Sequence, residues 1–228
     1  MKRHNTIDVA NPKYQYRSRS LPHWFDVDKP VFITYRLRFT LPNVIVQELQ
    51  KRKTEWFKEI QNLETEAKQT KLASKDGVFF AWFDELITKS IEVPQILHER
   101  EITDIIADSF RYFDNIRYQI IAYCIMPNHV HVLISPLKQA NGEIYPLSHI
   151  TYTWKKFTAA AINSFLGKSG NLWQQESYDH LVRDETELEK VIDYIIQNPV
   201  KARLVDKWED WYGTWVYVAQ ETSSAGHR

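Results

Sequence analysis

The sequence predicts an α+β protein in which helices pack on a mainly antiparallel sheet. Apolar residues recur with the period of strands or of helices, in the order strand, helices, two strands, helix, short strand, helix. A short break separates the two central strand segments, which favours antiparallel neighbours. A length of 228 residues without an internal repeat fits one domain with an insertion.

The chain begins with a basic arm, followed by a strand and a long helix. Residues 1–30 are rich in Lys and Arg and have no sustained apolar period. From Val31 to Arg38 polar and apolar residues alternate, which predicts a half-buried strand. Residues 44–73 carry apolar side chains at steps of three, four or seven, which predicts an amphipathic helix. We interpret residues 44–92 as a helical insertion.

The later segments supply the rest of the sheet and its helices. They are a helix over about 94–113, strands over 118–125 and 130–134, a helix over 147–166, a short strand within 173–182, and a helix over 185–197. The run 118–125 is almost wholly apolar, which predicts burial on both faces. Proline disfavours helical backbone at the residue before it, so the last helix is expected to end at Asn198–Pro199. The predicted domain spans 31–215, with a tail over 216–228.

Composition excludes several function classes. Lys and Arg together number 29, as do Asp and Glu, so the net charge is zero and gives no bulk argument for nucleic acid. The single cysteine, Cys124, excludes an internal disulfide and a zinc–thiolate cluster. No apolar run approaches the ~18 residues of a membrane-spanning helix. We therefore expect a cytoplasmic protein without a membrane partner.

Two histidines at the start of a predicted strand form the first candidate site. Because side chains alternate along a strand, His129 and His131 project to the same side, about 7 Å apart at the backbone, while Val130 points into the core. Both imidazoles are then able to bind one metal ion. An isolated pair of this kind is more often the polar face of an edge strand, and that alternative stays open.

Tyr194 and Asn198 form the second candidate site. They lie at i and i+4 of the last predicted helix, one above the other on one face. A tyrosine hydroxyl is able to act as a covalent nucleophile, and an amide oxygen is able to complete a metal site made of imidazoles. The alternatives are a core tyrosine and a C-terminal capping asparagine.

Several blocks of sequence carry a more specific pattern. They are Leu21–Trp24 (LPHW), Cys124–Ile134 (CIMPNHVHVLI), Tyr152–Thr158 (YTWKKFT), Leu172–Asp184 (LWQQESYDHLVRD) and Asp193–Ala202 (DYIIQNPVKA). In their order and spacing these blocks resemble the REP-associated tyrosine transposases, a branch of the single-tyrosine HUH transposases. The resemblance runs from about Arg19 to Val205.

The resemblance implies a fold, a chemistry and a substrate. The fold is the ferredoxin-like HUH endonuclease fold, in which the histidine strand and the tyrosine helix converge. His129 and His131 match the metal ligands, Tyr194 the nucleophile, and Asn198 the position of the third ligand, which is often Gln in related transposases. The implied activity cleaves and rejoins single-stranded DNA at hairpin repeats through a 5′-phosphotyrosine, with Mg²⁺ or Mn²⁺. The implied protein is a monomer or homodimer associated with the nucleoid.

The zero net charge conceals basic segments that are candidates for DNA contact. Residues 1–38 contain eight Lys or Arg and three Asp, residues 147–174 contain no acid, and residues 175–190 contain six acids against two basic residues. The candidates are Arg17, Arg19, Trp154, Lys155, Lys156, His180 and Arg183. Packing is the alternative for Trp154, and a structural role is the alternative for His180. Tyr178 is a rival nucleophile by residue type.

Two other functions stay open at this point. One is a domesticated protein that binds DNA hairpins with little or no cleavage. The other is a ferredoxin-like RNA-binding module or a metal-dependent phosphohydrolase that forms no covalent intermediate.

Overall fold

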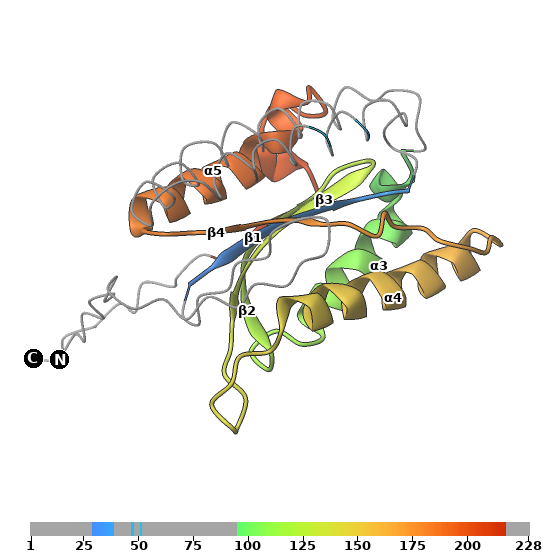
Figure 1. Cartoon of the computed structure of the whole chain (residues 1–228). Helices are drawn as coiled ribbons and strands as arrows, with labels where there is room; N and C mark the ends of the chain where they lie inside the picture. Colours follow the sequence, from blue (N-terminus) through green and yellow to red (C-terminus); the bar gives the residue numbers. More distant parts are fainter. Residues whose placement is uncertain (1–28, 39–46, 48–50, 52–94, 218–228) are drawn as a thin grey trace, which may run out of the picture.

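The centre of the fold is a five-stranded sheet with the strand order β4-β1-β3-β2-β5 (Figure 1). The computed structural model describes residues 29–38, 47, 51 and 95–217. The strands are β1 (Val31–Arg36), β2 (Tyr118–Ile125), β3 (His129–Pro136), β4 (Tyr178–Leu181) and β5 (Thr214–Val216). Every pairing between them is antiparallel. The predicted α+β class is therefore confirmed, and β5 is an addition that the sequence did not predict.

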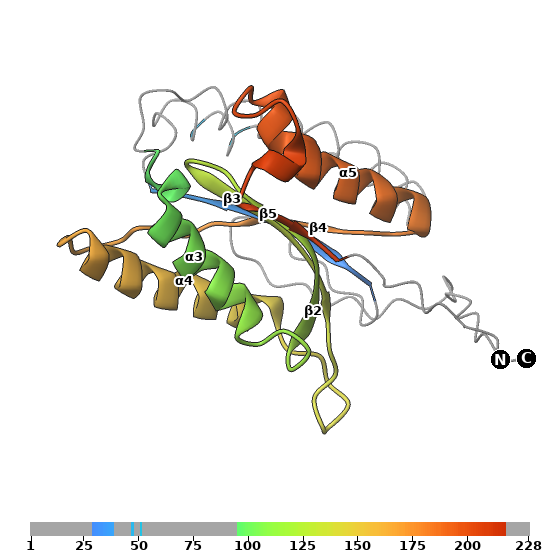
Figure 2. The same ribbon diagram turned by 180° about the vertical axis from the view of Figure 1, so that it is seen from behind.

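Helices cover both faces of this sheet. They are α3 (Arg100–Arg111), preceded by a 3₁₀ turn over Ile96–His98, α4 (Leu147–Phe165) and α5 (Glu185–Lys201), followed by a 3₁₀ turn over Trp208–Asp210. Helices α3 and α4 lie on one face and α5 on the opposite face, as both views show (Figures 1 and 2). The chain order β1-α3-β2-β3-α4-β4 with strand order β4-β1-β3-β2 is the ferredoxin-like arrangement, so this prediction is confirmed.

The alternation of side chains along the strands divides the core into two layers. Odd residues of β1, such as Ile33 and Tyr35, share one layer with Val130 and Val132 of β3 and with α3 and α4. Phe32 of β1 and Leu133 of β3 share the other layer with α5. Side chains at alternate positions of β3 therefore lie in two different layers, one against α3 and α4 and the other against α5.

The sequence predicted a half-buried strand over residues 31–38. The strand is present, but the half-burial is wrong, because every residue of β1 is buried. The polar residues of its alternation, Thr34 and Arg36, are 1% and 5% exposed. They lie on the face that α5 covers, where they neighbour β3 residues His131 and His129. The periodicity identified the polar face correctly, but that face lies against other polar groups under a helix and does not face solvent.

The predicted end of the last helix, at Asn198–Pro199, is also wrong. Helix α5 continues through Asn198 and Pro199 to Lys201. A proline in the last turn removes one backbone hydrogen bond, and the turn is closed by Arg203 N–H to Val200 O and Leu204 N–H to Pro199 O, both 2.9 Å. This pattern is a Schellman motif, in which Arg203 takes the left-handed conformation with φ of 58°. Asn198 is consequently helical and is not a terminal cap.

Several predictions fall outside the described residues. They concern most of the basic arm over 1–30, all but residues 47 and 51 of the helix over 44–73 and of the insertion over 44–92, and most of the tail over 216–228. Within the described parts, no helix has the length and apolar character needed to cross a membrane.

Candidate functional site

The two histidines lie in the middle of the sheet. His129 and His131 occupy β3, whose neighbours are β1 on one side and β2 on the other, and they are 1% and 0% exposed. Val130 is completely buried in the opposite layer. The prediction that both imidazoles project to one side is confirmed, and the edge-strand alternative is wrong because β3 is a central strand.

Hydrogen bonds fix both imidazole rings. The two Nε2 atoms are 3.0 Å apart, while the Nδ1 atoms lie 2.6 Å from Asn128 Oδ1 and 2.8 Å from Thr34 Oγ1. Asn128 Oδ1 is an acceptor, so His129 donates from Nδ1 and its Nε2 carries a lone pair. When His131 likewise donates to Thr34, both Nε2 lone pairs face each other, an arrangement that a shared cation would stabilise.

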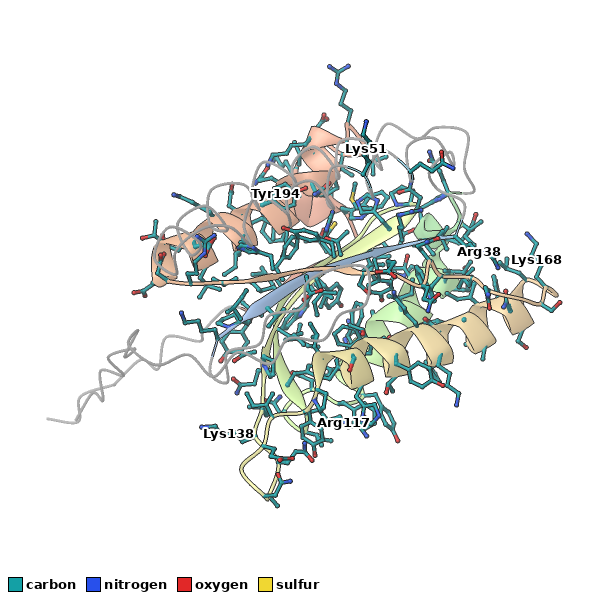
Figure 3. All side chains as sticks on the ribbon, viewed as in Figure 1. Arg38, Lys51, Arg117, Lys138, Lys168 and Tyr194 are labelled. Carbon is teal, nitrogen blue, oxygen red and sulfur yellow. The ribbon has the colours of Figure 1, made fainter. Side chains whose placement is uncertain are left out.

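Tyr194, on helix α5, packs against His131 of this pair. Figure 3 shows it on α5, above the sheet, and its ring centroid is 5.7 Å from that of His131. Phe32 of β1 lies beside both rings, with centroids 5.6 Å from His131 and 6.0 Å from Tyr194. Tyr194 is half-buried, whereas the rival Tyr178 is 8% exposed. Of the two tyrosines, Tyr194 therefore combines contact with a histidine and access to solvent.

Asn198 lies one helical turn beyond Tyr194 and is 3% exposed. Among the residues described, its buried Nδ2 atom has no hydrogen-bond partner. Because Nδ2 is a hydrogen-bond donor, the partner it lacks is an acceptor, and the atom of this amide that is able to bind a cation is Oδ1. Since α5 also delivers Tyr194 to the histidines, Asn198 is on the element that approaches them.

These side chains fit a divalent metal ion as a set. Two imidazole nitrogens that bind one ion at about 2.1 Å and at right angles to each other lie about 3 Å apart, close to the Nε2 separation observed. Asn128 and Thr34 would orient the rings from behind, as partners of metal-bound histidines do. The described residues contain no cluster of three His, Cys, Asp or Glu, and the amide of Asn198 is the side chain for which the resemblance predicts the third ligand position.

Two cations of this region were missed by sequence reasoning. Arg36 is the cross-strand partner of His129, and burial lowers the pKa of its guanidinium to about 10, which leaves it charged at neutral pH. Lys201 Nζ lies 4.9 Å from the centroid of the Tyr194 ring. The alternation in β1 was a signal for Arg36, because it placed this residue on the same face as Thr34.

The DNA-contact candidates of the Trp154–Lys156 segment lie on α4, across the sheet from the histidines (Figure 1). Trp154 is 1% exposed, and its Nε1 donates to the Tyr118 hydroxyl, which supports the packing alternative. Lys155 donates to the carbonyls of Gln174 and Gln175 and to Ser177 Oγ, and burial lowers its pKa to about 8. Lys156 is exposed and remains available to a ligand.

His180 and Arg183 surround a carboxylate at the first turn of α5. His180 Nε2 lies 3.0 Å and Arg183 NH2 2.9 Å from Glu187 Oε1, and the Arg183 backbone N–H donates to Oε2 at 2.7 Å. Burial alone would raise the pKa of Glu187, but these hydrogen bonds outweigh it and lower the pKa to about 2. The contacts favour the structural alternative for His180. Arg17 and Arg19 lie outside the described residues.

Two known proteins are similar in sequence to part of this chain. No protein-family model matches the chain. Over 102 residues it is 30% identical to a Haemophilus influenzae protein named "Putative REP-associated tyrosine transposase", an alignment that covers 41% of this chain and 56% of that protein. A second H. influenzae protein, which is uncharacterized, is 30% identical over 105 residues, or 39% of this chain and 57% of that one. The chain thus spans just over half the length of these curated relatives.

A solved structure of a REP-associated tyrosine transposase bound to a REP hairpin aligns with 94% of this chain and 97% of that one, with a TM-score of 0.47 and 17% identity. The sequence relationship to the first H. influenzae protein is independent of that alignment. It confirms the resemblance that the motifs predicted, and this chain is similar in sequence to a REP-associated tyrosine transposase.

Proposed function

We propose that this chain is a transposase that cleaves and rejoins single-stranded DNA at hairpin repeats through a tyrosine nucleophile. The observation that carries the proposal is the contact between Tyr194 on α5 and His131 on β3, whose Nε2 lies 3.0 Å from that of His129. A helix and a strand bring together a nucleophile and two neutral nitrogen ligands, which is the set that phosphodiester transfer requires. The H. influenzae relative, named as a transposase, supports the same class of reaction.

In the proposed reaction, the Tyr194 hydroxyl oxygen attacks the phosphorus of a phosphodiester in line with the leaving 3′ oxygen. A bond forms between the tyrosine oxygen and phosphorus, and the bond from phosphorus to the 3′ oxygen breaks. The phenol proton leaves to solvent, and the 3′ oxygen takes up a proton to become a free 3′-OH. The 5′-phosphotyrosine keeps the bond energy, so another 3′-OH is able to reverse the step.

His129, His131 and Asn198 are the residues that would hold Mg²⁺ or Mn²⁺. When bound there, the ion polarises the phosphate and neutralises charge that develops during transfer. Asn128 and Thr34 keep the imidazole rings in one orientation, and Phe32 fills the space beside His131 and Tyr194. These fixed neighbours align the nucleophile before DNA arrives.

The test is the formation of a covalent protein–DNA adduct. A hairpin-bearing oligonucleotide labelled at its 3′ end is incubated with the protein and Mn²⁺, then separated on a denaturing gel. The label is expected to shift with the wild-type protein and to stay free with Tyr194→Phe. Tyr152→Phe is the matched control, because Tyr152 is 60% exposed on α4, on the other face of the sheet.

Each alternative gives a different gel. Cleaved oligonucleotide without an adduct would indicate a phosphohydrolase, and binding without cleavage would indicate a hairpin-binding protein. An adduct that persists in Tyr194→Phe would contradict the assignment of the nucleophile and would direct attention to Tyr178.

A further inference from the structure

The last turn of α5 places a lysine on the ring of the proposed nucleophile. Lys201 follows Tyr194 by two helical turns, and its Nζ lies 4.9 Å from the Tyr194 ring centroid. His131 meets the same ring in an edge-to-face contact with planes at 77°. Tyr194 is therefore placed between the histidine pair on one side and an exposed ammonium group on another.

Lys201 carries a charge that the described protein does not neutralise. The acids of α5 are Glu185, Glu187, Glu189 and Asp193, and none of them lies within ion-pair distance of Lys201. Glu187 is already bound by His180 and Arg183. Within residues 95–217 and the short described segments before them, Lys201 forms no ion pair. Its positive charge thus remains available to an anion.

The helix dipole is a simpler explanation for a basic residue in the last turn of a helix. Cations at a helix C-terminus interact favourably with the helix dipole, and Arg203 provides a second cation just beyond the same terminus. That explanation applies to both residues equally. The contact with the Tyr194 ring is specific to Lys201 and places its Nζ beside the group that must approach a phosphate.

The substrate of the proposed reaction brings a phosphate to this position. An attacking oxygen and its phosphorus approach to about 3–3.5 Å before reaction, so the phosphate oxygens lie next to the Tyr194 hydroxyl, at the edge of the ring that Lys201 contacts. An ammonium group on a flexible stem is a common phosphate ligand, and it binds as a point charge without demanding one orientation. Arg36, buried beside His129, supplies positive charge on the sheet side of the same site.

We propose that Lys201 is a phosphate-binding residue of this site and contacts the phosphodiester that Tyr194 attacks. The inference rests on the proposed function and adds a substrate contact that the sequence motifs did not assign. Lys201 reaches the phosphate from the helix side, while the histidines and Arg36 approach it from the sheet side.

The test measures DNA binding without cleavage. In a Tyr194→Phe background, fluorescence anisotropy follows a labelled hairpin-bearing oligonucleotide over a series of NaCl concentrations. Lys201→Met keeps the aliphatic stem and removes the charge, and we expect about fivefold weaker binding. The slope of log affinity against log salt is expected to fall by about 0.7, which corresponds to one phosphate contact on a single strand. Lys201→Arg is expected to retain both values.

Arg203→Gly is the matched control. It removes one exposed charge from the same helix end and places glycine at a left-handed position, so the fold is preserved. Binding within twofold of the background supports a specific Lys201 contact. An equal loss in Arg203→Gly and Lys201→Met, or an unchanged slope in Lys201→Met, overturns the proposal.

The two proposals fail in different ways. If the wild-type protein forms no adduct but Lys201→Met still loses one phosphate contact, the cleavage proposal fails, and Lys201 stands only as a phosphate contact of a DNA-binding site. If the adduct forms normally and the binding of Lys201→Met is unchanged, the assignment of Lys201 fails and the cleavage proposal stands.

Discussion

Thr34→Val tests whether the histidine pair is oriented for a metal ion. The Thr34 hydroxyl lies 2.8 Å from His131 Nδ1, and Thr34 is 1% exposed. Valine has nearly the same shape but has no hydroxyl group, so the substitution removes this hydrogen bond without opening a cavity. It leaves the buried Nδ1 of His131 without this partner.

The size of the effect follows from burial. Loss of a buried hydrogen bond with one polar group left unpaired costs about 2 kcal/mol in the free energy of unfolding. With a denaturant slope of about 2 kcal/mol per molar urea, the unfolding midpoint is expected to fall by about 1 M. Because an outer hydrogen bond fixes the ring of a metal-binding histidine, Mn²⁺ affinity is expected to fall by about 10- to 100-fold.

Thr103→Val separates stability from metal binding. Thr103 is 2% exposed, and its hydroxyl donates to Leu97 O at 2.7 Å on the other face of the sheet. This variant is expected to unfold at lower urea but to bind Mn²⁺ like the wild type, with free Mn²⁺ measured by electron paramagnetic resonance. Equal Mn²⁺ affinity in Thr34→Val and Thr103→Val would refute the proposed role of Thr34 behind His131.

Two further predictions concern structural hydrogen bonds: those of Glu187, which binds the predicted DNA contacts His180 and Arg183, and those of Lys155, itself a predicted DNA contact. Glu187 has a pKa lowered to about 2, so its contribution to stability is present above its ordinary pKa and is lost as pH falls from about 4.5 to about 2. In urea unfolding at several pH values, Glu187→Gln should therefore be about 2 kcal/mol less stable than wild type at pH 7, with the gap closing toward pH 2; a constant gap, or an equal one in exposed Glu185→Gln, would contradict the pairing. Lys155→Met should lower the free energy of unfolding by about 2 kcal/mol at pH 7, because its ammonium binds the carbonyls of Gln174 and Gln175. Exposed Lys156→Met should change it by less than about 0.5 kcal/mol, and similar losses in both variants would show that charge alone matters.

The parts of the fold that depend on local pattern were predicted well. The run 118–125 coincides with β2, and the helix predicted over 147–166 differs from α4 by one residue. Both segments combine strong periodicity with clear breaks at their ends. The side on which His129 and His131 project also followed from alternation alone, which depends only on strand geometry.

Features that depend on tertiary contacts were not predictable in this way. Alternation marked Thr34 and Arg36 as polar-face residues, but it carries no information about the helix that covers this face. The continuation of α5 beyond Pro199 depends on the Schellman motif at Arg203, where glycine would have been the expected signal. Lys155 was predicted to contact DNA, yet its ammonium binds carbonyls that come from a segment about 20 residues away.

The strand–helix division of the site has a consequence for how its alignment is maintained. His131 is fixed in a strand with hydrogen-bonded neighbours on both sides, whereas α5, which carries Tyr194, packs on the sheet through apolar side chains such as Leu188 and Ile195. The spacing between Tyr194 and the two imidazoles is therefore determined by the volumes of residues that have no role in the proposed reaction. If the proposed reaction is correct, substitutions in that apolar layer would change the rate of strand transfer by changing this spacing, without removing any reactive group.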